Sequence, residues 1–214
     1  MLKGSVLEAA FYRFLGRYLV PCCAFLRLKA NHVSFFSLLC GLGAGIAFVF
    51  SPFWGGLLTL ITGLLDTLDG ALARELNQVK KRGAFLDSVL DRYSEFFILL
   101  GIWAYFLRKS HATPLITITV FLVLFGSVMV SYTKARAEGL MVSCFVGLFQ
   151  RGERIIAIGV AGMVNSLINF TARANEAALL GQDAVLIVTV IFLAVGTNLT
   201  ALWRFFHVLN KLKD

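Results

Sequence analysis

Four aspartates lie between long apolar runs, and this combination constrains the fold of the chain more than any other feature. No charged residue occurs from Pro52 to Leu65 before them or from Phe96 to Leu107 after them. An ionised carboxylate at the centre of a bilayer helix costs about 2.5–3.5 kcal/mol, so four together cost on the order of 10 kcal/mol. Apolar packing cannot offset this cost, whereas bound cations can. The four acids are Asp66, Asp69, Asp87 and Asp91.

The composition indicates one integral membrane domain. Apolar residues make up 58% of the 214 residues, against about 45–50% in ordinary soluble domains. We predict an all-α integral membrane protein in which six transmembrane helices follow an N-terminal interfacial amphipathic helix. The expected spans are approximately 32–50, 53–74, 84–107, 113–135, 154–172 and 183–207. In this prediction residues 1–30 form the interfacial juxtamembrane helix, and residues 31–214 form the membrane domain.

The N-terminal segment has the pattern of a helix that lies on a membrane surface. Large apolar side chains recur at helical spacing, while Arg13 and Arg17 fall on another face. Pro21 is expected to break or kink this helix. The alternative is an ordinary first span, which we disfavour because no uncharged window of about 18 residues precedes Lys29. The apolar residues of this face are Leu7, Phe11, Phe14, Leu15 and Tyr18.

The basic residues favour contact with membrane phosphates over binding to nucleic acid. The formal net charge is +8, but Lys and Arg stand at the ends of apolar segments and form no single patch. With a cytoplasmic N-terminus, the expected spans leave Arg108, Lys109 and Arg173 outside and the other basic residues inside. By the positive-inside rule, the sequence predicts a multi-pass protein of the cytoplasmic membrane whose acids face the cytoplasm.

The spacing of the acids predicts a metal site. Asp66 and Asp69 are three positions apart and so share one face of a helix. Asp87 and Asp91 are four positions apart and share a face of the next helix. A short loop between the two helices would bring the pairs together in an antiparallel arrangement. Sites made only of oxygen ligands suit Mg²⁺ or Mn²⁺, and two such ions are a common clamp for phosphoryl transfer.

Two other interpretations compete with the metal site. The acids could form buried salt bridges with Arg74 and Arg92, but two arginines cannot neutralise four acids. The chain could also be a cation or proton transporter, because acids inside a membrane mark ion paths as well. A transporter would more naturally carry its acids at several depths and on distant helices, whereas these acids fall at one predicted membrane face.

The segment from Asp66 to Asp91 follows the pattern D-x2-D-G-x2-A-R-x8-G-x3-D-x3-D and thereby resembles the CDP-alcohol phosphatidyltransferase family. The resemblance implies an enzyme that moves a phosphatidyl group from CDP-diacylglycerol to an alcohol and releases CMP. It also implies two Mg²⁺ ions, for which Mn²⁺ can substitute, and a homodimer among membrane lipids. The matching residues are Asp66, Asp69, Gly70, Ala73, Arg74, Gly83, Asp87 and Asp91.

The resemblance also implies roles for individual residues. All four aspartates would be metal ligands, and Asp91 would in addition be the catalytic base, although the sequence alone does not separate base from ligand. Residues near the start of the first span have two open interpretations, a helix cap or a contact with the nucleotide. The residues implied for CDP-lipid binding are Asn31, Ser34, Asp69, Gly70, Ala73, Arg74 and Gly83.

Three basic clusters at predicted cytoplasmic helix ends suggest a pocket for a phosphorylated acceptor. They resemble those of the subgroup that makes phosphatidylinositol phosphate from myo-inositol 1-phosphate, with Gly152 where that subgroup has proline. The resemblance implies that the acceptor phosphate is held by Lys134, Arg154 and Arg204. Two alternatives stay open: each residue could be an ordinary anchor at the membrane surface, or the acceptor could be glycerol 3-phosphate, as in phosphatidylglycerophosphate synthases.

Overall fold

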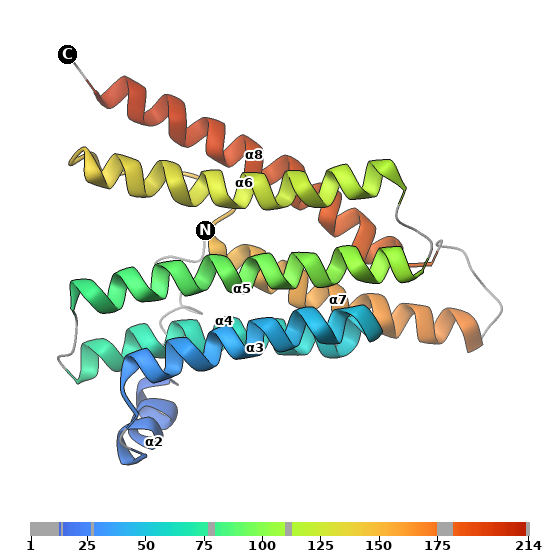
Figure 1. The fold of residues 1–214 in the computed structure, drawn as a ribbon, viewed down its shortest axis with the longest axis horizontal. Coiled ribbons are helices and arrows are strands. Elements are labelled where there is room, and N and C mark those ends of the chain that lie inside the picture. The colour runs from blue at the N-terminus through green and yellow to red at the C-terminus, as the bar shows by residue number, and fades with distance from the viewer. Residues whose placement is uncertain are drawn as a thin grey trace.

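The structure is a computed structural model that describes residues 13, 15–26, 28–76, 80–109, 113–174 and 182–212. In these residues the regular structure is helical, and Figure 1 shows the long helices running side by side along one axis. The elements in chain order are the π-helix η1 (Leu15–Leu19), α2 (Val20–Phe25), α3 (Ala30–Phe50), α4 (Pro52–Glu75), α5 (Lys81–Arg108), α6 (Pro114–Gly139), α7 (Arg151–Ala174) and α8 (Ala184–Lys211).

Five described helices are long and apolar enough to cross a membrane: α3, α4, α6, α8 and the Arg151–Thr171 part of α7. Helix α5 is as long as α8 and runs beside α3 (Figure 1). Its part up to residue 95 carries Asp87, Asp91 and Glu95, which lower its hydropathy. The all-helical prediction therefore agrees with the structure, while the span predicted at 84–107 stays a prediction.

Helices α6 and α8 extend past the predicted span ends, to Gly139 and Lys211. Their last turns carry charged residues, among them Arg136 on α6. A helix satisfies its own backbone hydrogen bonds and can continue into water, whereas hydropathy marks only the part that suits hydrocarbon. The predicted ends of these two spans therefore fall where the apolar pattern ends, before the ends of the helices.

The described part of the N-terminal segment packs against α4. Leu15, Val20 and Cys23 are buried in one cluster with Leu68 and Leu72 of α4. The helix type changes from π to α next to Pro21, which cannot donate a backbone hydrogen bond. Residues 1–12, 14 and 27 lie outside the described residues, and the interfacial helix expected over residues 1–30 stays a prediction.

Glycines allow the helices around the site to touch backbone to backbone. A Cβ added to Gly101 of α5 would fall on the backbone of Gly45 in α3. A Cβ added to Gly162 of α7 would lie 2.6 Å from the carbonyl oxygen of Pro52 at the start of α4. Small residues at such crossings are typical of membrane helix packing. These contacts fix α5 against α3 and α7 against α4.

The substitution Gly45→Ala tests the crossing of α3 and α5. The added Cβ would fall on the Phe97 carbonyl oxygen, and overpacking of this kind costs about 1–3 kcal/mol. We expect the melting temperature of the detergent-purified protein to fall by several degrees. Gly43→Ala on the same helix is the matched control, because its Cβ would meet its nearest neighbour, Leu58, at 3.9 Å. Equal melting temperatures for the two variants would contradict this packing.

Candidate functional site

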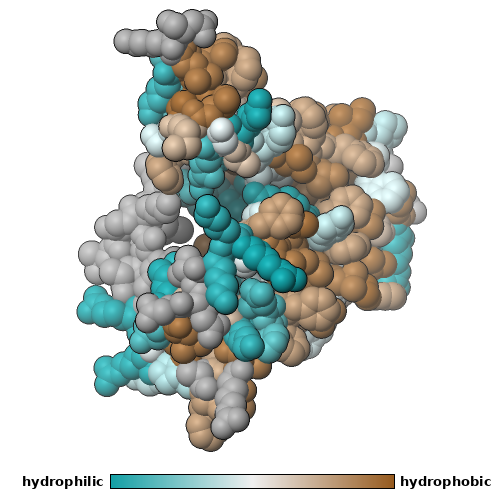
Figure 2. All heavy atoms as spheres, turned by 60° about the vertical axis from the view of Figure 1, so that its left-hand side comes forward, coloured by the Kyte–Doolittle hydropathy of each residue, from teal (hydrophilic) through white to brown (hydrophobic). Residues whose placement is uncertain are grey.

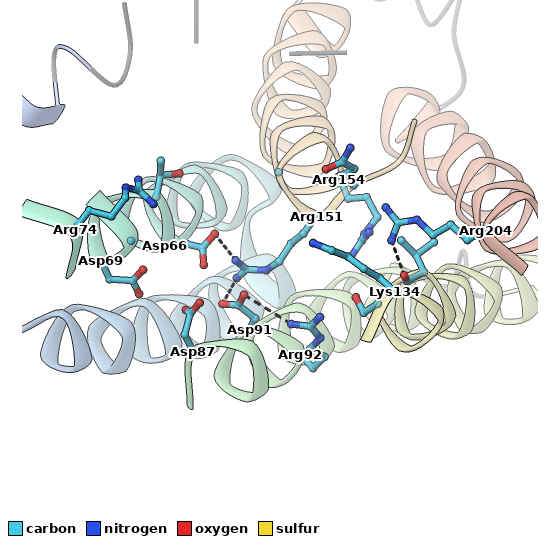
Figure 3. A pocket seen from close by; sticks show the side chains of 16 residues that line it. Asp66, Asp69, Arg74, Asp87, Asp91, Arg92, Lys134, Arg151, Arg154 and Arg204 are labelled. Atoms are coloured by element: carbon cyan, nitrogen blue, oxygen red, sulfur yellow. Dashed lines mark hydrogen bonds and ion pairs between the residues drawn. The ribbon is translucent and has the colours of Figure 1, made fainter. Parts of the chain in front are cut away.

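The acid cluster forms where the end of α4 meets the start of α5. Carboxylate oxygens of Asp66, Asp69 and Asp87 lie within 4.8 Å of one another. Asp91 follows Asp87 by one turn of α5 and is buried. The antiparallel helix pair predicted from the spacing is therefore present, although Asp91 stands outside the tight group of three (Figure 3).

Ser34 holds one of these acids. Its hydroxyl donates a hydrogen bond of 2.6 Å to Oδ2 of Asp69, and both side chains are buried. The cap of α3 involves a different residue, because His32 Nδ1 accepts the backbone N–H of Lys29 at 3.3 Å. The helix-cap interpretation of this region therefore applies to His32. Ser34 would influence a nucleotide through the orientation of Asp69.

Arg151 lies between two of the acids. Its Nη1 is 2.5 Å from Oδ2 of Asp66, and its Nη2 is 2.9 Å from Oδ1 of Asp91. The side chain comes from the first residue of α7, and this helix start is fixed by the N–H of Gln150, which donates to the Glu153 carboxylate at 3.0 Å. In the sequence, Arg151 is one of several basic residues at a predicted helix end, and its spacing gave no signal of this contact with the acids.

The alternative interpretation expected the acids to form salt bridges with Arg74 and Arg92, but the close partner of the acids is Arg151. Arg92 lies 3.9 Å from Asp91, with a side chain that is 39% exposed, so its attraction is weakened by solvent. Arg151 provides the close contacts instead. One close arginine leaves most of the charge of four acids uncompensated. The donor set therefore fits divalent cations, which prefer clustered carboxylate oxygens.

One cavity of about 390 Å³ joins the acids to the basic clusters. The four aspartates, Gly70 and Arg74 line one part, and Figure 3 shows Lys134, Arg154 and Arg204 on the other side of Arg151. Figure 2 shows hydrophilic side chains gathered at this end of a molecule that is otherwise largely apolar. The cavity thus brings together most residues that the sequence analysis assigned to separate substrates.

Other predicted residues lie beside this cavity. Asn31 and Gly83 line a second cavity of about 360 Å³ together with three basic residues, Lys29, Lys80 and Arg82. A Cβ added to Gly83 would come within 3.3 Å of the Asn31 side-chain oxygen, so glycine permits this approach of α5 to α3. Ala73 is half-buried on α4 and is not among the residues that line either cavity.

Arg154 and Arg204 also have structural partners. Arg154 is fully buried and donates to both oxygens of Glu95, at 2.6 and 2.8 Å, and to the Phe149 carbonyl oxygen at 2.9 Å. Arg204 donates to the carbonyl oxygens of Val146 and Val130, at 2.8 and 2.6 Å. These bonds hold the connection between α6 and α7. The spacing of charged residues gave no signal for Glu95.

Lys134 has the most accessible charge of the three predicted acceptor residues. Its side chain is 40% exposed, and its Nζ lies 3.7 Å from a carboxylate oxygen of Glu138 on the same helix. It reaches the cavity that also contains the acids. Lys134 can therefore take up a phosphate without breaking a buried hydrogen bond.

A smaller apolar cavity of about 280 Å³ adjoins the charged one between α4 and α7. The two cavities share Asp66, Thr67, Arg151 and Gly152. Leu60, Leu64, Ile155 and Ile156 line its apolar part. An amphipathic ligand could therefore place its charged group among the acids and arginines and its apolar part between α4 and α7.

Comparison with known proteins gives concordant matches. The family model described as CDP-alcohol phosphatidyltransferase matches residues 27–210. An archaetidylinositol phosphate synthase of Methanothermobacter thermautotrophicus is 37% identical over 161 residues, which are 74% of this chain and 78% of that protein. A phosphatidylinositol phosphate synthase of Streptomyces avermitilis is 33% identical over 202 residues, which are 89% of this chain and 78% of that protein.

The fold is similar to that of a solved enzyme. The crystal structure of Mycobacterium tuberculosis phosphatidylinositol phosphate synthase in complex with manganese and citrate matches with a TM-score of 0.76. The match covers 89% of this chain and 87% of that chain, at 24% sequence identity. At this identity the likeness shows the fold alone, that of a multi-pass helical membrane protein.

Arg154→Ala tests the buried pair with Glu95. Removal of one partner leaves a buried charge uncompensated, which costs about 3–5 kcal/mol, so we expect a large drop in melting temperature. The double variant Glu95→Gln with Arg154→Gln removes both charges and should recover a substantial part of that loss. Thermal unfolding of the detergent-purified variants measures both effects. A single variant as stable as the original protein would show that the pair contributes little.

Proposed function

We propose that this chain, which belongs to the CDP-alcohol phosphatidyltransferase family, uses myo-inositol 1-phosphate as its acceptor. It is an enzyme that transfers a phosphatidyl group from CDP-diacylglycerol to an alcohol. The family assignment removes the reason to prefer a cation or proton transporter. The observation that carries the choice of acceptor is the cavity in which basic residues face the acid cluster.

The basic side of the cavity supports a phosphorylated acceptor. Lys134 offers an accessible ammonium group, and Arg204 adds a positive charge from α8. Arg154 also lines the cavity, but its charge is paired with Glu95, so it would contribute less to holding the acceptor phosphate. Cationic groups that surround a phosphate form charge-assisted hydrogen bonds, which are stronger than neutral ones. The two relatives described above are named as inositol phosphate synthases of archaetidyl and phosphatidyl lipids. Glycerol 3-phosphate, which carries the same phosphate, is the alternative acceptor within the family.

Two divalent ions, Mg²⁺ with Mn²⁺ able to substitute, would be held by Asp66, Asp69, Asp87 and Asp91 and would neutralise the diphosphate of the CDP-lipid. Asp91 would accept the proton of the attacking alcohol hydroxyl, since it lies at the edge of the acid group that faces the basic residues. The hydroxyl oxygen would then form a bond to the lipid-bearing phosphorus. The bond between this phosphorus and the bridging oxygen of the diphosphate would break, and CMP would leave with its electrons.

The donor lipid would bind along α4. Gly70 and Arg74 line the acid side of the cavity and would contact the nucleotide, with Asn31, Ala73 and Gly83 nearby and Ser34 acting through Asp69. The apolar cavity between α4 and α7 would receive acyl chain, because it meets the charged cavity at Asp66 and Arg151. This arrangement keeps the diphosphate in the polar part and the lipid in the apolar part.

The chain is a multi-pass membrane protein, and its finer arrangement is part of the proposal. Helix α5 would be a sixth span, because 28 residues extend about 42 Å at 1.5 Å per residue. Residues 1–30 would be an interfacial helix before the membrane domain of residues 31–214. The site would open to the cytoplasm by the positive-inside rule. We also propose that the protein forms a homodimer and does not bind nucleic acid.

The substitution Asp91→Asn tests its role as a base. Loss of a general base lowers turnover by about 10²–10⁴-fold while ground-state binding persists. We expect kcat to fall on this scale and the dissociation constant for CDP-diacylglycerol to change little. Asp69→Asn is the contrasting variant, expected to weaken metal and CDP-lipid binding. If Asp91→Asn lost metal and lipid binding together, Asp91 would be chiefly a ligand.

The substitution Lys134→Ala tests the acceptor pocket. A charge-assisted contact contributes about 1.5–3 kcal/mol, so we expect the KM for inositol 1-phosphate to rise roughly 10- to 150-fold. The KM for CDP-diacylglycerol should stay nearly constant. Arg136→Ala is the matched control, because Arg136 is exposed on the same helix and is not among the residues that line the cavity.

The choice of acceptor is measured by CMP release from CDP-diacylglycerol with inositol 1-phosphate, glycerol 3-phosphate, inositol and serine. We expect inositol 1-phosphate to give the highest kcat/KM. A preference for glycerol 3-phosphate would support the phosphate pocket but would show that the acceptor alcohol is glycerol 3-phosphate. Efficient use of free inositol or serine would show that the acceptor needs no phosphate pocket. The basic residues would then be membrane anchors.

A further inference from the structure

Arg151 differs from the other arginines of the site in how it is held. Its guanidinium forms ion pairs with Asp66 and Asp91, yet its Nε and Nη2 are buried and have no hydrogen-bond partner among the described residues. An arginine carries five N–H donors. The Nε–H therefore has no acceptor, and the two ion pairs with Asp66 and Asp91 are what keep the side chain in place.

Arg154, one turn further along α7, shows the contrast. All three of its guanidinium nitrogens donate to protein oxygens, two of them to Glu95 and one to the Phe149 carbonyl. A bidentate pair of this kind fixes the geometry as well as the charge. Arg154 is thus a permanent connection between α5 and α7, whereas Arg151 can leave its position without breaking such a network.

The position of Arg151 matches one part of the acid cluster. The three carboxylates that lie within 4.8 Å of one another are Asp66, Asp69 and Asp87. Asp91, the fourth, contacts Arg151 instead. Two divalent ions would bring four positive charges to four carboxylates, and the neutralised cluster would then no longer attract the guanidinium. Arg151 and a second metal ion therefore compete for the same side of the cluster.

We propose that Arg151 is a tethered cation that neutralises Asp66 and Asp91 until a second divalent ion takes its place. This inference rests on the proposed metal-dependent function and adds a residue that it did not assign. Once displaced, the guanidinium remains beside both cavities, because Arg151 lines the charged and the apolar one. That is the boundary at which the lipid-bearing phosphate would lie, so the released Arg151 binds this phosphate.

Mn²⁺ binding without any CDP-lipid tests the exchange. Free Mn²⁺ is counted by electron paramagnetic resonance in titrations of the detergent-purified protein and of Arg151→Gln. We expect the original protein to bind one Mn²⁺ tightly and a second more weakly. Coupling free energies of about 1–3 kcal/mol between two binding events change affinity by about 5- to 150-fold, so the variant should bind the second Mn²⁺ more tightly within this range.

Arg92→Gln is the matched control, since it also removes a positive charge near Asp91. Arg92 is 3.9 Å from that carboxylate and partly exposed, so we expect little change in Mn²⁺ affinity. If both variants bound the second Mn²⁺ more tightly to the same extent, the net positive charge near the acids, and not the position of Arg151, would govern metal binding. This result would overturn the exchange. Absence of Mn²⁺ binding in every protein would overturn the metal-dependent function itself.

Thermal unfolding separates exchange from a structural role. In chelator, Arg151→Gln leaves Asp66 and Asp91 without their close cation, so its melting temperature should fall below that of the original protein. Saturating Mn²⁺ should close the gap, because the ion replaces the missing charge. A gap of the same size with and without Mn²⁺ would make Arg151 a structural residue. If Arg151→Gln does not fold, Arg151→Lys takes its place. The difference in melting temperature between Arg151→Lys and the original protein should then also disappear in saturating Mn²⁺, and a difference that persists would overturn the exchange.

Discussion

Mutual repulsion of four carboxylates at the end of an apolar bundle is the constraint to which the surrounding polar structure responds. Asp69 is stabilised by the hydroxyl of Ser34, which reaches it from α3. Asp66 and Asp91 share the guanidinium of Arg151, which comes from α7. Two other helices, α3 and α7, thus contribute to keeping the acids of α4 and α5 together. Because carboxylates near the hydrocarbon are costly, such contributions offset part of the repulsion between the acids of α4 and α5.

Helix α7 compensates charge in two distinct ways within one turn. Arg154 neutralises Glu95 inside the bundle through a bidentate pair that no solvent reaches. Arg151 faces the cavity and makes ion pairs with fewer hydrogen bonds. The close packing of α7 on α4 at Gly162 sets the depth of both side chains. The rigid arginine holds the helix in place, and the position of the helix lets the less constrained arginine reach the acids.

The sequence was most informative where spacing along one helix decides the outcome. Asp66 with Asp69, and Asp87 with Asp91, share helix faces because periodicity requires it, and one short connection then determines that the pairs meet. Contacts between helices distant in the chain were not predictable in this way. The pairing of Arg154 with Glu95 joins residues 59 positions apart. A single sequence states which side chains are charged, but not which neighbour each one faces after packing.

The order of charges across the cavity explains how one space can accept two anionic substrates. A diphosphate and a phosphorylated alcohol repel each other, so each needs its own source of positive charge. On one side the acids can gather divalent cations, and on the other Lys134 and Arg204 provide positive charge. Arg151 stands between the two sides, in contact with the acids and beside the apolar cavity. In the proposed reaction the new bond would form at this boundary, because there the lipid-bearing phosphorus and the acceptor hydroxyl would approach each other while each anion keeps its own counter-charge.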